Sequence, residues 1–255
     1  MGRVLTRIVS ETDGCEIAGG LEAQGSSQIG MDMGLISGIG ALNIVISDDA
    51  SAVLQNADGI IDFTVPLATL SLLSHTAALK KIHVIGTTGI DAAGDRQIRE
   101  AAKSTVIMKT GNYSFGVNIL ASIVKKVAAA LGEDFDIEIL EMHHRHKIDA
   151  PSGTALLLGQ AAAEGRKINL EDHSVRGRDG HTGARNSGDI GFATLRGGSV
   201  VGDHTVVFAG AAERIALTHK AESRDIFAYG AVKAAVWCAS QKPGLYNMND
   251  VLGLN

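Results

Sequence analysis

Short apolar runs alternate with stretches of helical periodicity along the first half of the chain. The runs Glu16–Leu21, Gly59–Phe63, His83–Ile85 and Val106–Lys109 have the length and composition of buried strands. The stretches around and between these runs predict helices at Arg3–Glu11, Asp48–Ala57, Pro66–Leu79 and Gly94–Ser104. This repeated alternation of strand and helix predicts a parallel sheet that is covered by helices on both faces.

The pattern changes after about residue 114. A long helix is predicted first, then alternating apolar and polar runs bounded by glycines, which are typical of a mixed sheet with one wet face. The predicted helices are Val117–Leu131, Thr154–Gly165 and Ile226–Ala239, and the predicted strands are Asp136–His143, Asp189–Leu195, Gly202–Ala209 and Glu213–His219. We therefore expect an α/β unit followed by an α+β unit with an open mixed sheet. The closing helix could belong to either unit.

Charge and composition narrow the possible partners. The chain has 255 residues, 23 Lys and Arg against 28 Asp and Glu, and a formal net charge of −5. This balance argues against a nucleic-acid partner, and no uninterrupted apolar run is long enough to predict a membrane span. The N-terminus lacks the apolar core of a signal peptide. Cys15 and Cys238 stand far apart without metal-type spacing, so we expect two free thiols and a cytoplasmic location.

Small polar residues follow three of the predicted parallel strands. The sequences are DFTVP at 62–66, GTTG at 86–89 and TGNYS at 110–114. The carboxyl ends of parallel strands are where such sheets bind ligands, and glycine lets a ligand approach the backbone. Three such turns along one sheet edge favour a nucleotide, and Glu22 stands where an acid would hold a ribose hydroxyl. A dinucleotide fold normally opens with a strand and a glycine-rich phosphate loop, but this chain enters its first helix directly.

The stretch EMHHRHKIDAPSGTALLLG at 141–159 gathers three histidines and two cations just ahead of a predicted helix. Ser152 is expected to cap this helix, and the N–H groups of Gly153 and Thr154 at its start suit a carboxylate or phosphate. The run of His143, His144, His146 and Lys147 would bring titratable and cationic groups to the same place. Two other interpretations stay open: a basic surface loop that only caps the helix, and a zinc site, for which no nearby residue completes the ligand set.

The stretch EMHHRHKIDAPSGTA resembles the signature of the 4-hydroxy-tetrahydrodipicolinate reductase family, also called dihydrodipicolinate reductases. Further matching segments cover effectively the whole chain: IDFTVP, VIGTTG, GNYSFGVN, GRDGHTG, RGGSVVGDHTV and LTHKAESRDIFAYGA. The resemblance implies a Rossmann-like dinucleotide-binding domain at 1–114, completed by 224–255, that carries NADH or NADPH. It also implies a substrate-binding and tetramerisation domain at 115–223, a cyclic dicarboxylate substrate, and reduction with loss of water in diaminopimelate and lysine biosynthesis.

The resemblance also assigns roles to individual residues. It implies that His143 is the catalytic acid or base, that Lys147 is a second proton donor, and that His144, Gly153 and Thr154 hold the substrate carboxylates. No metal is implied. The residues implied to bind the cofactor lie at the strand ends: Glu22, Phe63, Thr64, Gly86, Thr87, Thr88, Thr110, Gly111, Asn112 and Tyr113.

Two departures from the family pattern bear on activity. The family's phosphate loop reads GxxGRMGR and this chain begins within it, and Ala23 stands where several members carry an arginine for the 2′-phosphate of NADPH. An alternative is therefore an N-terminally truncated member that folds and binds the dicarboxylate but turns it over poorly. An oxidoreductase of the aspartate-semialdehyde type has no support, because neither cysteine stands in the context of a nucleophile.

Overall fold

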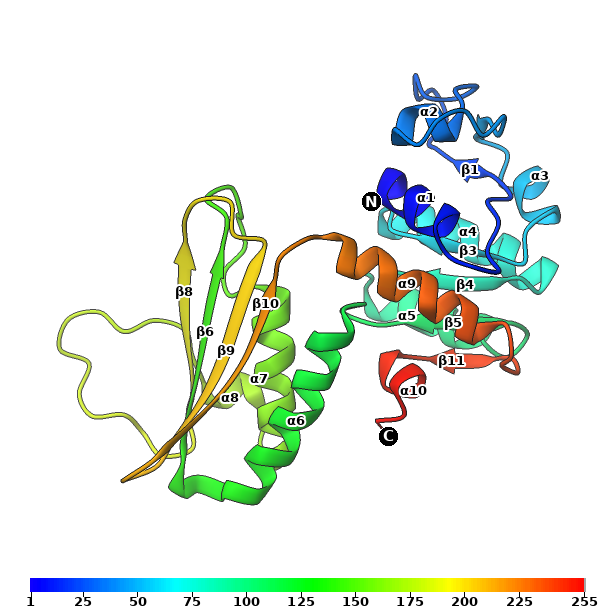
Figure 1. The fold of residues 1–255 in the computed structure, drawn as a ribbon. Helices are drawn as coiled ribbons and strands as arrows, with labels where there is room; N and C mark the ends of the chain where they lie inside the picture. The colour runs from blue at the N-terminus through cyan, green and yellow to red at the C-terminus, as the bar shows by residue number, and fades with distance from the viewer. Residues whose placement is uncertain (255) are drawn as a thin grey trace. The chain divides into compact units, whose positions relative to one another are not determined.

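The computed structural model describes residues 1–254, and these fold as two compact units (Figure 1). Unit 1 contains Met1–Ser114 together with the returning segment Asp225–Gly253. Unit 2 contains Phe115–Arg224.

Unit 1 is built on parallel strands. Its larger sheet has the order β11-β5-β4-β3, in which all neighbours run parallel. The strands are β3 (Gly59–Asp62), β4 (Ile82–Ile85), β5 (Val106–Lys109) and β11 (Gly244–Tyr246). The helices are α1 (Gly2–Ser10), α2 (Met33–Ser37), α3 (Ala50–Gln55), α4 (Pro66–Leu79), α5 (Ala92–Ala101), α9 (Asp225–Cys238) and α10 (Met248–Leu252).

Local sequence explains the helices that flank this sheet. Asp91 caps α5 by accepting a hydrogen bond from the N–H of Gly94, and Pro66 opens α4 at a position that needs no amide donor. The inner faces of α4 and α5 place Leu73 and Ile98 against Ile85 and Ile107 of the central strands. The result is the Rossmann-type arrangement predicted from the sequence.

A break divides the strands of unit 1 into two sheets. β1 (Gly20–Leu21) pairs only with β2 (Ile46–Ser47), and β3 pairs only with β4, within residues 1–254. One edge of β1 and one edge of β3 therefore have no strand partner in this part of the chain. Unpaired strand edges leave backbone donors and acceptors free to accept another strand.

Unit 2 holds a five-stranded mixed sheet of order β10-β9-β6-β8-β7. Its central strand β6 (Asp136–His143) runs parallel to β8 (Ile190–Arg196) and antiparallel to β9 (Gly202–Ala209). The remaining elements are α6 (Phe115–Leu131), the short 3₁₀ helix η1 (Gly132–Asp134), α7 (Gly153–Arg166), α8 (Leu170–His173), β7 (Ser174–Val175) and β10 (Arg214–Ala221). This is the open mixed sheet that the sequence predicts.

Helices α6 and α7 cover one face of this sheet (Figure 1). Alternation along β6 sends Ile137, Ile139, Glu141 and His143 to the buried side, whereas Leu140 on the other side is 41% exposed. Helix α6 and η1 together are long and apolar enough to pass as a membrane span by composition. The packing of α6 against α7 and the sheet accounts for its apolar residues as part of the core of unit 2.

The elements that the sequence analysis misplaced or missed are short. The strand expected at Glu16–Leu21 is reduced to Gly20–Leu21, because glycine is a weak strand former and this strand pairs on one side only. Strand β11 was not predicted, since three residues carry no period. It forms because the chain returns beside β5 after α9.

Candidate active site

The three polar turns of unit 1 lie at one edge of its sheet. The parallel register aligns Asp62 of β3 with Ile85 of β4, and Ile85 with Lys109 of β5, so the turns that follow these strands are neighbours. Thr64, Thr88 and Gly111 are exposed there, which leaves hydroxyl and backbone groups accessible to a ligand.

A buried network supports this edge from below. Asp62 is 2% exposed and accepts hydrogen bonds from the backbone N–H of Thr64 at 2.9 Å and from its hydroxyl at 2.6 Å. The other carboxylate oxygen lies 3.3 Å from Nε2 of the fully buried His83. Burial raises the pKa of Asp62, but the hydrogen bonds from His83 and Thr64 outweigh burial and bring it below its usual value. An ionised Asp62 therefore fixes the turn that begins at Thr64.

Not every predicted cofactor residue faces solvent. Tyr113 is 2% exposed, and its hydroxyl donates to the carbonyl of Ile85 at 2.8 Å, so its side chain ties the ends of two strands together. Burial raises the pKa of Tyr113 well above its usual value. Thr87 is also buried and accepts from the Thr69 hydroxyl at 2.7 Å. These two residues shape the edge, whereas Thr64, Thr88 and Gly111 are the groups that a ligand could touch.

The other residues predicted to bind the cofactor lie around the same edge. Phe63, Gly86, Thr110 and Asn112 are half-buried within these turns. Glu22 follows β1 and is exposed, with one carboxylate oxygen accepting from the N–H of Ala23 at 2.9 Å.

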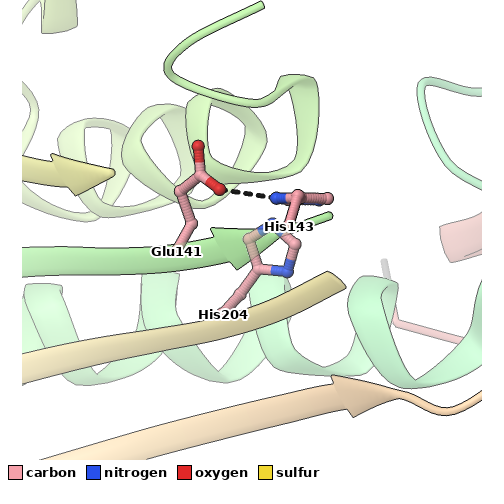
Figure 2. Close-up of side chains that lie close together, drawn as sticks. All are labelled: Glu141, His143 and His204. Carbon is pink, nitrogen blue, oxygen red and sulfur yellow. Dashed lines mark hydrogen bonds and ion pairs between the residues drawn. The ribbon is translucent and has the colours of Figure 1, made fainter. Parts of the chain in front are cut away.

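In unit 2, the end of β6 carries a buried acid beside a histidine (Figure 2). Glu141 and His143 are two residues apart on one strand and so point to the same side of the sheet. His143 Nδ1 lies 2.5 Å from Glu141 Oε2, and the two residues are 8% and 1% exposed.

Arg196 at the end of β8 holds Glu141 from the neighbouring strand. The register pairs Arg196 with His143, and its guanidinium donates to both oxygens of Glu141, at 2.9 and 3.0 Å. Burial raises the pKa of Glu141, but the hydrogen bonds from Arg196 and His143 outweigh burial and hold it below its usual value. An ionised carboxylate can only accept hydrogen bonds, so the proton of the contact with His143 lies on Nδ1.

Glu141 also anchors the start of α7. The backbone N–H of Ser152 donates to Glu141 Oε1 at 3.1 Å, and the Ser152 hydroxyl accepts from the N–H of Ala155 at 3.1 Å. The predicted cap by Ser152 is therefore confirmed. Gly153 is exposed and Thr154 is half-buried in the first turn of the helix, where the dipole favours an anion.

A second histidine completes the buried cluster. His204 of β9 is 3% exposed, packs edge-on against the ring of His143, and places Nε2 2.9 Å from the Ser152 hydroxyl. Its Nδ1 has no hydrogen-bond partner among the described residues. Burial, helped by the nearby charge of His143, lowers the pKa of His204 to about 4.

The loop between β6 and α7 carries the remaining cations. Lys147 forms an ion pair with Asp149 at 2.8 Å, and Arg196 donates to the Asp149 carbonyl at 2.6 Å. His144 Nε2 lies 3.1 Å from the exposed Arg224 guanidinium. A surface pocket next to this loop is lined by His144, His146, Gly198, Ser199, Val201 and Arg224.

Metal binding can be tested against this geometry. Ligand atoms of Glu141, His143 and His204 lie within 4.8 Å of one another. However, Arg196 already donates to both carboxylate oxygens of Glu141 and compensates its charge. A cation would have to displace this guanidinium, so the cluster suits acid–base chemistry better than metal binding. The HHxH spacing does not form the metal cluster, because His144 and His146 lie on the surface loop.

The sequence did not predict a role for four residues that lie at this site. Glu141, Arg196, His204 and Arg224 stand inside the motifs quoted above, but none was given a role. Only Glu141 carried a local signal, since it stands two residues before His143 on an alternating strand. Arg196 and His204 come from neighbouring strands and reach the site through strand pairing, whereas Arg224 comes from the loop after β10 and contacts His144.

Comparison with known proteins agrees with this arrangement. Residues 1–113 match the family model for the N-terminus of dihydrodipicolinate reductase, and residues 116–252 match the model for its C-terminus. A curated 4-hydroxy-tetrahydrodipicolinate reductase of Rhodopseudomonas palustris (strain HaA2) is 57% identical over 254 residues, which cover 100% of this chain and 94% of the relative. Another, of Brucella abortus (strain 2308), is 57% identical over 256 residues, which cover 100% of this chain and 96% of the relative.

The fold is also found in a solved structure. A dipicolinate-bound dihydrodipicolinate reductase from Paenisporosarcina sp. TG-14 superimposes with a TM-score of 0.77 at 22% identity, covering 98% of this chain and 94% of that one. Together with the Rossmann-type unit and the α+β unit, the family models and the relatives show a two-domain reductase. The chain belongs to the dihydrodipicolinate reductase family.

The lowered pKa of His204 makes the stability of the protein depend on pH. In the unfolded chain His204 takes up a proton below about pH 6.5, whereas in the folded protein its pKa is about 4. The stabilisation is therefore fully present above about pH 6.5 and is lost as pH falls towards 4. At pH 4.5 the loss should be on the order of 2–3 kcal/mol relative to pH 7.

Urea unfolding at pH 7 and pH 4.5, at one protein concentration, measures this effect. His204→Gln should lose less stability between the two pH values than the unmodified chain does. His181→Gln, at an exposed loop position, is the control and should behave like the unmodified chain. Equal losses in the His204→Gln variant and the unmodified chain would show that His204 accepts a proton in the folded protein.

Proposed function

We propose that this chain catalyses the NAD(P)H-dependent reduction of 4-hydroxy-tetrahydrodipicolinate to tetrahydrodipicolinate with loss of water, a step of diaminopimelate and lysine biosynthesis. The membership of the family and the names of relatives at 57% identity support the reaction. The observation that carries the proposal is the buried Glu141–His143 pair beside the start of α7. With His143 as the donor, this pair would put a proton next to a helix end that suits a carboxylate.

The edge of unit 1 fits a dinucleotide. Exposed Thr64 and Thr88 offer hydroxyls, and a side chain added at Gly111 would meet no atom within 4 Å, so a ligand can approach the backbone there. Glu22 would accept hydrogen bonds from the ribose hydroxyls. When bound, the reduced nicotinamide supplies a hydride. Ala23 offers no cation for a 2′-phosphate, so NADH should be accepted at least as well as NADPH.

The dicarboxylate would bind in unit 2. Gly153 and Thr154 at the start of α7 would hold one carboxylate. Lys147, in the loop just before this helix, would add a positive charge for the same carboxylate. The paired His144 and Arg224 line the neighbouring pocket, and we assign the second carboxylate to them. The dipicolinate bound to the Paenisporosarcina enzyme supports a flat dicarboxylate as ligand of this fold.

His143 would deliver the proton. Reduction adds one hydride and one proton to the substrate and releases one water. With Nδ1–H directed at Glu141, the other ring nitrogen, Nε2, carries the proton that is transferred. Nε2 lies over Gly202, where an added Cβ would be only 3.0 Å away, so the glycine keeps this nitrogen uncovered. Lys147 would serve as a second donor. We further propose a cytoplasmic homotetramer.

Changing His143 to Gln tests the assignment of the acid. We expect kcat to fall by roughly 10²–10⁴ with a smaller change in KM, because general-acid assistance acts in the transition state. His181→Gln is the control and should keep the activity of the unmodified chain. If kcat of the His143→Gln variant stays within about a factor of two, His143 has no part in the mechanism.

Calorimetry tests the ligands and the choice of cofactor. Glu22 would accept hydrogen bonds from the ribose hydroxyls, and Ala23 offers no cation for the 2′-phosphate of NADPH. We expect the chain to bind dipicolinate, and to bind NADH at least as tightly as NADPH.

A preference for NADPH of more than about tenfold would show that Glu22 and Ala23 do not set the choice of cofactor.

A further inference from the structure

The carboxylate of Glu141 contacts His143, Arg196 and the start of α7 at Ser152. Glu141 Oε2 accepts from His143 and Arg196, and Oε1 accepts from Arg196 and from the backbone of Ser152. Thr194 of β8 adds its hydroxyl to Oε1 at 3.3 Å. All the donors point at a side chain that is 1% exposed.

We propose that Glu141 is the positioning residue of the proton donor: with Arg196 as its fixed counter-ion, it holds His143 by Nδ1–H so that Nε2 carries the transferable proton. This inference rests on the proposed function and names a residue that neither touches the substrate nor transfers a proton. The same carboxylate fixes Ser152, and so it sets the distance between the acid and the helix end that would hold the substrate.

The charge balance explains why Arg196 is needed. A buried carboxylate without a partner would become protonated, and a protonated carboxyl could no longer hold His143 as an ionic acceptor. The bidentate guanidinium keeps Glu141 ionised while leaving Oε2 able to accept from His143. Arg196 also donates to the Asp149 carbonyl, so it holds the loop that carries Lys147 to the same centre.

A matched pair of variants separates positioning from folding. Glu141→Gln keeps the size of the side chain but removes its charge. Glu138→Gln is the control: Glu138 lies on the same strand and accepts two hydrogen bonds from Arg178, at 2.9 Å each, but none from a histidine. Because an unpaired Arg196 could destabilise the first variant, the double variant Glu141→Gln/Arg196→Gln removes both charges together.

The experiment measures kcat and KM for reduction of 4-hydroxy-tetrahydrodipicolinate, with the thermal unfolding temperature recorded for each protein. For Glu141→Gln and the double variant we expect kcat to fall about 10²-fold. We also expect KM to change much less than kcat, because a positioned proton donor acts in the transition state rather than in substrate binding. Glu138→Gln should keep both kcat and KM.

Each outcome bears on one claim. An inactive unmodified chain would contradict the proposed function itself. An active chain whose Glu141→Gln variant keeps its kcat, or loses kcat and substrate affinity by similar factors, would overturn the positioning role. If neither Glu141→Gln nor the double variant folds, the positioning role is also overturned, because Glu141 and Arg196 would then be needed for folding alone.

Discussion

The site in unit 2 depends on one buried ion pair, between Glu141 of β6 and Arg196 of β8. A carboxylate that is 1% exposed would be costly without a partner, and the bidentate guanidinium keeps it ionised. The ionised carboxylate then fixes the tautomer of His143 and the backbone of Ser152. Pairing of β6 with β8 sets the distance between Glu141 and Arg196. The position of His143, the proposed acid, therefore follows from the register of the sheet.

Unit 1 uses the same principle at its own sheet edge. Asp62 is a buried carboxylate at the end of a strand, and it fixes the turn at Thr64 while His83 supports it from the next strand. In both units an acid at the end of a strand orients the next turn, and the groups left exposed are small hydroxyls and backbone amides. Such a site is prepared before its ligand arrives, which lowers the entropy cost of binding.

The sequence predicted most of the architecture because the strands are apolar runs and the helices are long enough to show a period. It also predicted the Ser152 cap, which is confirmed, and it selected His143, whose role stays a prediction, from the same continuous motif. It could not give roles to Arg196, His204 or Arg224, because these residues reach the site through strand pairing and a loop far along the chain. Tyr113 lies in a motif that was expected to bind the cofactor, but its side chain is buried. The position of a residue in a motif does not reveal which way its side chain points.

The tautomer of His143 tests the central claim most directly. In protein labelled with ¹⁵N-histidine, NMR at about pH 8 reports which ring nitrogen carries the proton, and the His143→Gln variant assigns the signal. The account predicts a proton on Nδ1 with a strongly downfield shift, as expected for the 2.5 Å contact with an ionised Glu141. A neutral His143 with a bare Nδ1 and its proton on Nε2 would contradict the account.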